Sequence, residues 1–253
     1  MHLVERVQHT NAWSGWHPGG KLLLGGSLLL LSMVLPVFPG ALLILASVAG
    51  AVLVARIRAA DYLRVLAAPL AFLLTAAVAL MVTVRPDGGP PWFEVSMQSI
   101  AVAAEVTLRA LAATASLLVI VLTIPLPDLL GLLKQLRIPG PILDITFLTY
   151  RFATLAIGVA ERTRLAQANR LGYSGVRTSI RSTGALAAAL LPRVLDRARR
   201  METGLATRAY AGELRTLSAP MPLSPRFVAA TLALDVVIIA VSLAWRTLLG
   251  PLG

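Results

Sequence analysis

The sequence predicts an all-α membrane protein with about five transmembrane helices and an additional region of amphipathic helices. Hydrophobic residues make up 57% of the 253 residues and charged residues only 14%, against roughly 25% charged residues in a soluble domain. The mean hydropathy of +0.78 leaves too few polar residues to cover the surface of soluble domains. This composition therefore excludes a soluble enzyme and a disordered chain.

Five stretches are long and apolar enough to cross a membrane, because a helix of about 20 residues spans a hydrocarbon core about 30 Å thick. They are residues 22–37, 40–55, 65–84, 99–124 and 227–245. The first two are expected to form a hairpin, since Pro36, Pro39 and Gly40 interrupt a continuous helix.

Basic charge is concentrated between the fourth and fifth predicted crossings. Of the 23 Lys and Arg residues, 15 fall within 125–226 together with six acidic residues, so this segment carries +9 of the net charge of +11. We therefore divide the chain into a four-helix transmembrane region (1–124), a basic region (125–226) and a C-terminal transmembrane helix (227–253).

Short loops rich in Lys and Arg mark the cytoplasmic side of a membrane protein. Arg56, Arg58 and Arg64 follow the second stretch, whereas the loop after the third stretch holds one cation, Arg85. This bias predicts a multi-pass protein of the cell (inner) membrane, with a cytoplasmic N-terminus and basic region and an outside C-terminus. Residues 141–160 are apolar enough for a sixth crossing, but that crossing would place the following arginines outside. We interpret them as a long amphipathic or partly embedded helix.

The basic region is predicted to contain amphipathic helices. Leucines between Asp128 and Arg137 form a helical stripe with an acidic start and a basic end, which suits a helix at the membrane interface. Longer basic helices are predicted around 151–171 and 186–210, with a break at 172–175.

The two longer basic helices end on similar tripeptides separated by 38 residues. These X-Arg-X motifs are Asn169, Arg170 and Leu171 in the first helix and Thr207, Arg208 and Ala209 in the second. A single arginine at a helix C-terminus is explained by the helix dipole. Two equivalent arginines favour paired docking elements for a two-lobed or dimeric partner.

Further motifs accompany the paired arginines. They are His-Pro-Gly-Gly-Lys-Leu-Leu at 17–23, Thr-Ile-Pro-Leu-Pro-Asp-Leu-Leu at 123–130, Leu-Arg-Ile-Pro at 136–139 and Tyr-Arg-Phe at 150–152. With these motifs the sequence resembles the transmembrane coupling (T) component of energy-coupling factor (ECF) transporters, most closely the cobalt-type CbiQ members. The resemblance extends over nearly the whole chain.

The resemblance implies a non-catalytic coupling subunit of an ATP-driven importer. In that family the X-Arg-X motifs end coupling helices, and their arginines dock into grooves of two ATP-binding cassette ATPase subunits. The movement passes to a substrate-binding membrane subunit. By this resemblance, Arg170 and Arg208 are the expected docking residues.

Two positions depart from the family pattern. The family favours Ala-Arg-Gly where this chain has Asn169-Arg170-Leu171, and Asp-Pro-Arg where it has His17-Pro18-Gly19. The resemblance makes cobalt the expected substrate, in support of cobalamin biosynthesis. Nickel or a vitamin stays an alternative, because substrate choice in that family belongs to another subunit.

No pattern in the sequence indicates a catalytic centre, a cofactor or a metal site. Cysteine is absent, and the three histidines all fall within the first 17 residues. The sequence also has no P-loop motif, so ATP hydrolysis is expected in the partner subunits. Arginines dispersed on amphipathic helices beside a membrane also argue against nucleic-acid binding.

Glu105 and Arg109 lie one helical turn apart in the fourth predicted crossing. Ionisable residues inside a membrane are candidates for an ion or proton relay, but we favour a neutralising pair buried between helices. Asp235, in the last crossing, is a comparable case with an arginine as the expected partner. A secondary transporter or channel without an ATPase partner is the alternative function, which the scarcity of charge in the crossings disfavours.

Overall fold

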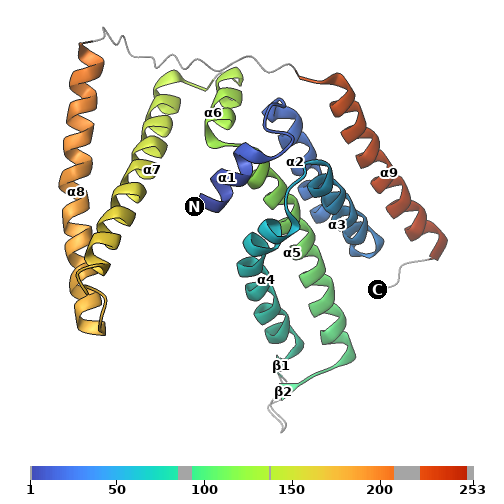
Figure 1. The fold of residues 1–253 in the computed structure, drawn as a ribbon. Helices are drawn as coiled ribbons and strands as arrows, with labels where there is room; N and C mark the ends of the chain where they lie inside the picture. The colour runs from blue at the N-terminus through green and yellow to red at the C-terminus, as the bar shows by residue number, and fades with distance from the viewer. Residues whose placement is uncertain (1, 85–92, 137, 208–222, 250–253) are drawn as a thin grey trace. The chain divides into compact units, whose positions relative to one another are not determined.

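The computed structural model describes residues 2–84, 93–136, 138–207 and 223–249. These residues are almost entirely helical, which confirms the predicted all-α membrane class (Figure 1). The chain divides into two compact units, one formed by 1–129 with 219–253 and the other by 130–218.

The elements follow one another as a series of helices with one short strand pair. The helices are α1 (His2–Thr10), α2 (Pro18–Val34), α3 (Val37–Val54), α4 (Ala59–Met81), α5 (Met97–Thr123), α6 (Leu126–Gln135), α7 (Gly140–Ala168), α8 (Val176–Ala206) and α9 (Pro225–Leu249). Strands β1 (Thr83–Val84) and β2 (Phe93–Glu94) pair antiparallel between α4 and α5.

The predicted crossings correspond to α2, α3, α4, α5 and α9, and the predicted break at Pro36 separates α2 from α3. Among the described residues, five helices are long and apolar enough to span a membrane, namely α3, α4, α5, α7 and α9. The number agrees with the prediction, but the set differs. Helix α2 is shorter, with 17 residues, and α7 contains the stretch 141–160 that we interpreted as amphipathic or partly embedded.

The sequence prediction missed helix α1 and placed the start of α8 too late. Helix α1 was not expected, because its short, polar sequence has no apolar run. Helix α8 begins at Val176 rather than at 186, since local hydrogen bonds start it early. The N–H of Gly175 donates to the hydroxyl of Thr178 (2.9 Å), and the hydroxyl of Ser179 donates to the Gly175 carbonyl (2.7 Å).

Helix α5 is the central helix of the first unit, where α1, α2, α3 and α4 all contact it and α9 packs against α2 and α3 (Figure 1). Fully buried side chains come from four of these helices, including Leu28, Ile44, Leu122 and Ile238. Their burial gives this unit an apolar core between the helices.

Helix α2 packs tightly against α5 at Gly25. A Cβ atom added there would overlap Cγ1 of Ile120 and lie 3.3 Å from the carbonyl oxygen of Ser116. The neighbouring Gly26 has no atom within 4 Å of the same position. Gly25 is therefore required by packing, whereas Gly26 is not.

The C-terminal end of α5 is capped by side chains from the N-terminal segment. The last carbonyls of a helix lack partners within the helix, and Pro125 has no N–H to offer them. Three side chains supply the missing donors. Gln8 donates to the Val121 carbonyl (2.7 Å), Asn11 to the Leu122 carbonyl (3.4 Å) and the fully buried Lys21 to the Thr123 carbonyl (3.3 Å). The cation of Lys21 also complements the negative end of the helix dipole.

Replacement of Asn11 by alanine is expected to lower the free energy of unfolding by about 2 kcal/mol, because several buried hydrogen bonds are lost. The side chain of Asn11 is 4% exposed, and it donates to the Val7 carbonyl (2.9 Å) and accepts from the Trp13 N–H (2.9 Å). Denaturant unfolding in detergent measures the change. Thr10→Ala is the matched control, since the Thr10 hydroxyl bonds an exposed carbonyl of its own helix. Equal stability of the two variants would contradict the capping role.

Candidate functional site

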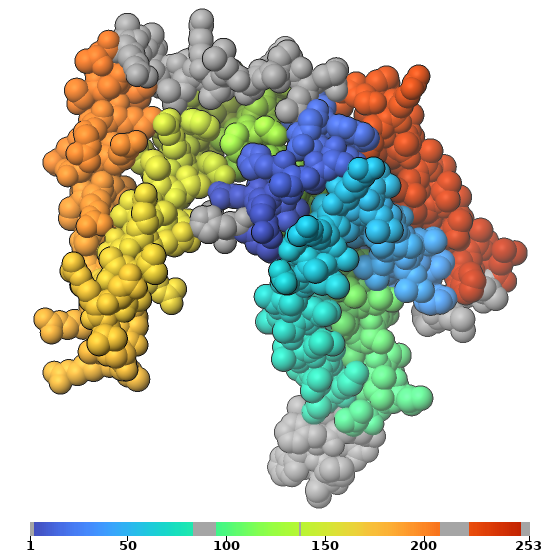
Figure 2. All heavy atoms as spheres, viewed as in Figure 1, coloured from blue at the N-terminus to red at the C-terminus, as the bar shows by residue number. Residues whose placement is uncertain are grey.

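Helices α7 and α8 pack as an antiparallel hairpin in the second unit. Figure 2 shows the two helices running beside each other, in yellow and orange, with side chains projecting from the surface near the turn that joins them. None of the described residues of α8 is buried, and Leu143 is the buried residue of α7. Most of the hairpin surface is therefore not covered within its own unit.

Each X-Arg-X motif begins directly after a helix, as the sequence predicts. The N–H of Asn169 donates to the Leu165 carbonyl after α7, and the N–H of Thr207 donates to the Thr203 carbonyl after α8, both at 3.0 Å. Asn169 and Thr207 also have nearly the same backbone angles. The two motifs therefore start in equivalent local structures. Arg208 and Ala209 lie outside the described residues.

The first arginine occupies a regular helix-ending turn. The N–H of Gly172 donates to the Gln167 carbonyl (2.8 Å), the N–H of Leu171 donates to the Ala168 carbonyl (3.0 Å), and Leu171 has φ +59°. These two bonds and the left-handed residue define a Schellman motif. Arg170 stands immediately before the left-handed residue, with its side chain exposed.

A hydrogen-bond network that the sequence prediction did not identify holds this turn. The amide of Gln167 donates to the Ser182 carbonyl (3.1 Å) and accepts from the Tyr173 hydroxyl (2.8 Å). The Ser182 hydroxyl donates to the Gly172 carbonyl (2.8 Å). A Cβ atom on Gly172 would lie only 2.9 Å from the Gln167 carbonyl oxygen, so glycine is needed there. The network fixes the backbone that carries Arg170.

Leu171 occupies the position at which the family that the sequence resembles favours glycine. Its positive φ costs about 1 kcal/mol for a residue other than glycine, and its side chain is 75% exposed. No burial within the described chain offsets this strain. The structure therefore gives a conformational reason for the glycine in the family motif.

We expect Leu171→Gly to raise the free energy of unfolding of the isolated chain by about 0.5–1 kcal/mol, because glycine relieves the strain. Leu165→Gly is the matched control. Leu165 is 64% exposed within α7, where glycine costs about 1 kcal/mol. Thermal unfolding in detergent should show opposite shifts for the two variants. A loss of stability in both would contradict the strain at Leu171.

The expected intramembrane pair is present in α5, where a guanidinium nitrogen of Arg109 lies 3.4 Å from a carboxylate oxygen of Glu105. Its predicted burial between helices is wrong, because the two side chains are 42% and 56% exposed, respectively. The pair faces outward from the first unit. Its charges neutralise each other at the surface of α5.

Two other polar residues have partners that the sequence did not predict. Asp235 in α9 accepts a hydrogen bond from the Ser27 hydroxyl (3.1 Å), so the expected arginine partner is wrong. His17 accepts the N–H of Gly19 at Nδ1 (3.0 Å) and caps α2. An aspartate, which the family favours here, would cap the helix in the same way. Among the described residues, no cluster of His, Cys, Asp or Glu is suited to hold a metal ion.

Comparison with known proteins places these features in a family. A family model for CbiQ, a cobalt transport protein, matches residues 9–218. The cobalt transport protein CbiQ of Rhodobacter capsulatus is 39% identical over 238 residues, which cover 94% of this chain and 96% of the relative. CbiQ of Salmonella typhimurium is 31% identical over 221 residues, covering 83% and 97% of the two chains.

A third relative carries the same similarity inside a longer protein. The putative fused cobalt transport protein CbiMQ of Methanocorpusculum labreanum is 30% identical over 186 residues, which cover 70% of this chain and 30% of the relative. The family model spans most of the chain, and the first two relatives match nearly their whole length. The chain therefore belongs to the CbiQ family of cobalt transport proteins and is a multi-pass membrane component of transport.

Proposed function

We propose that this chain is the non-catalytic coupling subunit of an ATP-driven ECF importer for cobalt ions. It links two ATP-binding cassette ATPase subunits to a substrate-binding membrane subunit. The observation that carries the proposal is the fixed turn at the end of α7, which presents the exposed side chain of Arg170. The family's name and its close relatives support cobalt as the transported ion.

The chemistry of arginine suits this role. A guanidinium group offers five N–H donors in a rigid plane and stays protonated at every physiological pH. An exposed arginine on a fixed turn can enter a groove of a partner and form paired hydrogen bonds with a carboxylate. Because the turn is already fixed, little conformational entropy of the backbone is lost on binding. Leu171, exposed beside it, supplies apolar surface that a partner would cover. Arg208 is proposed for the same role in the second motif.

Movement of the ATPase subunits would reach the membrane through α7 and α8. The Gln167 network ties the two helices together beside Arg170, so a force on the turn moves both helices as one body. The two helices lie beside each other near the turn that joins them (Figure 1). The proposed orientation places the turn and the N-terminus in the cytoplasm and the C-terminus outside.

A fused relative supports a second membrane partner. The similarity to this chain accounts for 30% of the CbiMQ protein, so another segment is covalently joined to the part that resembles this chain. Fusion places two segments at high effective concentration. This supports a substrate-binding membrane subunit as a permanent neighbour of the chain.

Purification of the native complex through an affinity tag on this chain tests the proposal. We expect two ATPase subunits and one further membrane protein to co-purify, with cobalt bound to the further membrane protein. Quantitative mass spectrometry of the subunits and metal analysis measure both results. Recovery of the chain without any ATPase would contradict the proposal and favour a channel or secondary transporter.

A further inference from the structure

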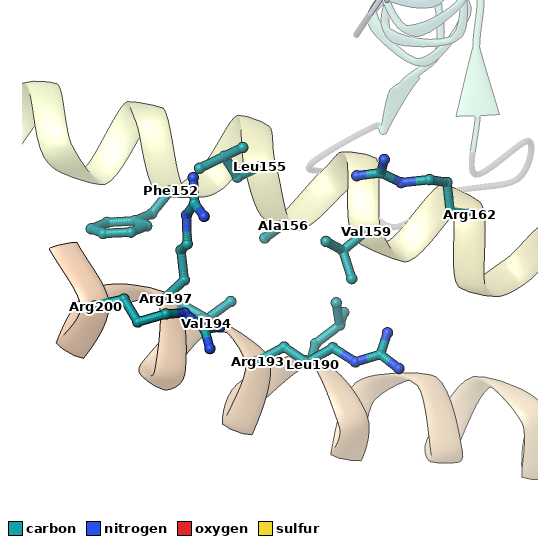
Figure 3. Close-up of a pocket in the computed structure, with 10 residues that line it drawn as sticks. All are labelled: Phe152, Leu155, Ala156, Val159, Arg162, Leu190, Arg193, Val194, Arg197 and Arg200. Atoms are coloured by element: carbon teal, nitrogen blue, oxygen red, sulfur yellow. The ribbon is translucent and has the colours of Figure 1, made fainter.

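A groove between α7 and α8 combines a basic rim with an apolar floor. It has a volume of about 400 Å³, and Figure 3 shows the side chains around it. Four of its lining residues are arginines and the other six are apolar; the arginines are Arg162, Arg193, Arg197 and Arg200. None of the lining residues is acidic. The occupant that such a surface complements is both anionic and apolar.

Two of the arginines are held in position by neighbouring groups. The Nε–H of Arg162 donates to the Gly158 carbonyl (3.1 Å), and a terminal N–H of Arg193 donates to the Thr163 hydroxyl (3.1 Å). Each guanidinium keeps further N–H donors beyond these bonds. Figure 3 shows Arg197 extending from α8 across the groove toward α7. The four guanidinium groups therefore surround the groove (Figure 3).

The floor of the groove is apolar along the direction of the helices. Phe152, Leu155, Ala156 and Val159 line it from α7, and Leu190 and Val194 line it from α8. A hydrocarbon chain lying between the helices would cover these side chains. Covering the floor would be favourable, because apolar protein surface removed from water contributes about 25 cal/mol per Å².

We propose that this groove binds an anionic phospholipid, with the phosphate against the arginines and an acyl chain along the floor. Basic pockets between helices at the cytoplasmic face of a membrane recognise anionic headgroups. Helix α7 is apolar enough to enter a membrane, and the hairpin has little buried surface of its own. An anionic lipid supplies negative charge to pair with the arginines and an acyl chain to cover the apolar floor. This inference does not depend on the docking of Arg170.

Lipid binding is tested with the full chain in nanodiscs of phosphatidylcholine containing a minor fraction of phosphatidylglycerol or cardiolipin. Lipid retained by the purified protein is measured by native mass spectrometry after transfer to detergent. The variant Arg193→Gln/Arg197→Gln/Arg200→Gln is expected to retain anionic lipid about 100-fold more weakly, or roughly 5-fold for each arginine removed. A charge-matched variant, Arg177→Gln/Arg181→Gln/Arg199→Gln, changes the same helix outside the groove and should keep wild-type retention.

A second variant tests the apolar floor without a change of charge. Ala156→Phe should fill the floor and reduce lipid retention at least about 10-fold, while glycerol phosphate added in solution should not displace lipid from the wild type. Equal retention by the wild type and the arginine variant would overturn the proposal. So would photo-crosslinking from position 194, in the complex purified from cells, to a protein subunit in place of lipid.

Discussion

Replacement of Arg170 and Arg208 together by glutamate is expected to abolish co-purification of this chain with ATPase subunits. Arg170 is exposed at a turn fixed by backbone bonds and by the Gln167 network. Removing one partner of a buried, hydrogen-bonded charge pair costs roughly 2 kcal/mol or more, and two sites together weaken assembly by at least about 100-fold. Glutamate adds repulsion against a partner carboxylate.

The control for this experiment keeps the change in charge but moves it elsewhere. Arg199→Glu/Arg246→Glu alters two exposed arginines, one on α8 and one in the last turn of α9. We expect this variant to assemble like the wild type. Circular dichroism of both variants checks that the helices remain. Assembly and cobalt uptake by the Arg170/Arg208 variant at wild-type levels would remove the docking hypothesis.

Replacement of Gly25 by leucine is expected to destabilise the first unit by about 3 kcal/mol or more. Even a methyl group at this position would overlap Ile120 and crowd the Ser116 carbonyl, so a leucine must push α2 away from α5. Overpacking of a close helix contact costs typically 1–3 kcal/mol, and occasionally more. Thermal unfolding in detergent measures the loss.

Gly26→Leu is the matched control for the helix contact. Gly26 lies beside Gly25 on α2, and a Cβ atom there would have open space around it. The two variants change helix propensity and hydrophobicity equally, so a difference between them reports packing alone. Similar stability of the two variants would show that α2 and α5 do not approach each other as described.

Much of the fold could be predicted from hydropathy and breaker residues. Long apolar runs predict α3, α5 and α9 within a few residues, because a helix that faces lipid must be apolar along its length. The run at 65–84 predicts α4, which begins earlier, at Ala59. The prolines at 36 and 39 also predict the break between α2 and α3. Helix α1 was not predicted, because Gln8 within it and Asn11 directly after it cap α5, a tertiary role that has no periodic signal in the sequence.

The candidate site could be predicted only in part. The repeat of X-Arg-X located the ends of α7 and α8, because small and turn-forming residues follow each helix. The bonds of Gln167 with Ser182 and Tyr173 were not predictable, since they depend on how the hairpin folds back. The outward position of Glu105 and Arg109 was missed for a similar reason. Their i,i+4 spacing fixes the pair but not the direction in which it faces.

The central claim is that the chain couples ATP hydrolysis in its partners to cobalt uptake. Uptake of radioactive cobalt into proteoliposomes tests this most directly, with the chain reconstituted alone and with its co-purified subunits, each with and without ATP. We predict uptake only for the complete complex with ATP, and its loss in the Arg170/Arg208 variant. Cobalt uptake by the chain alone, without ATP, would contradict the account.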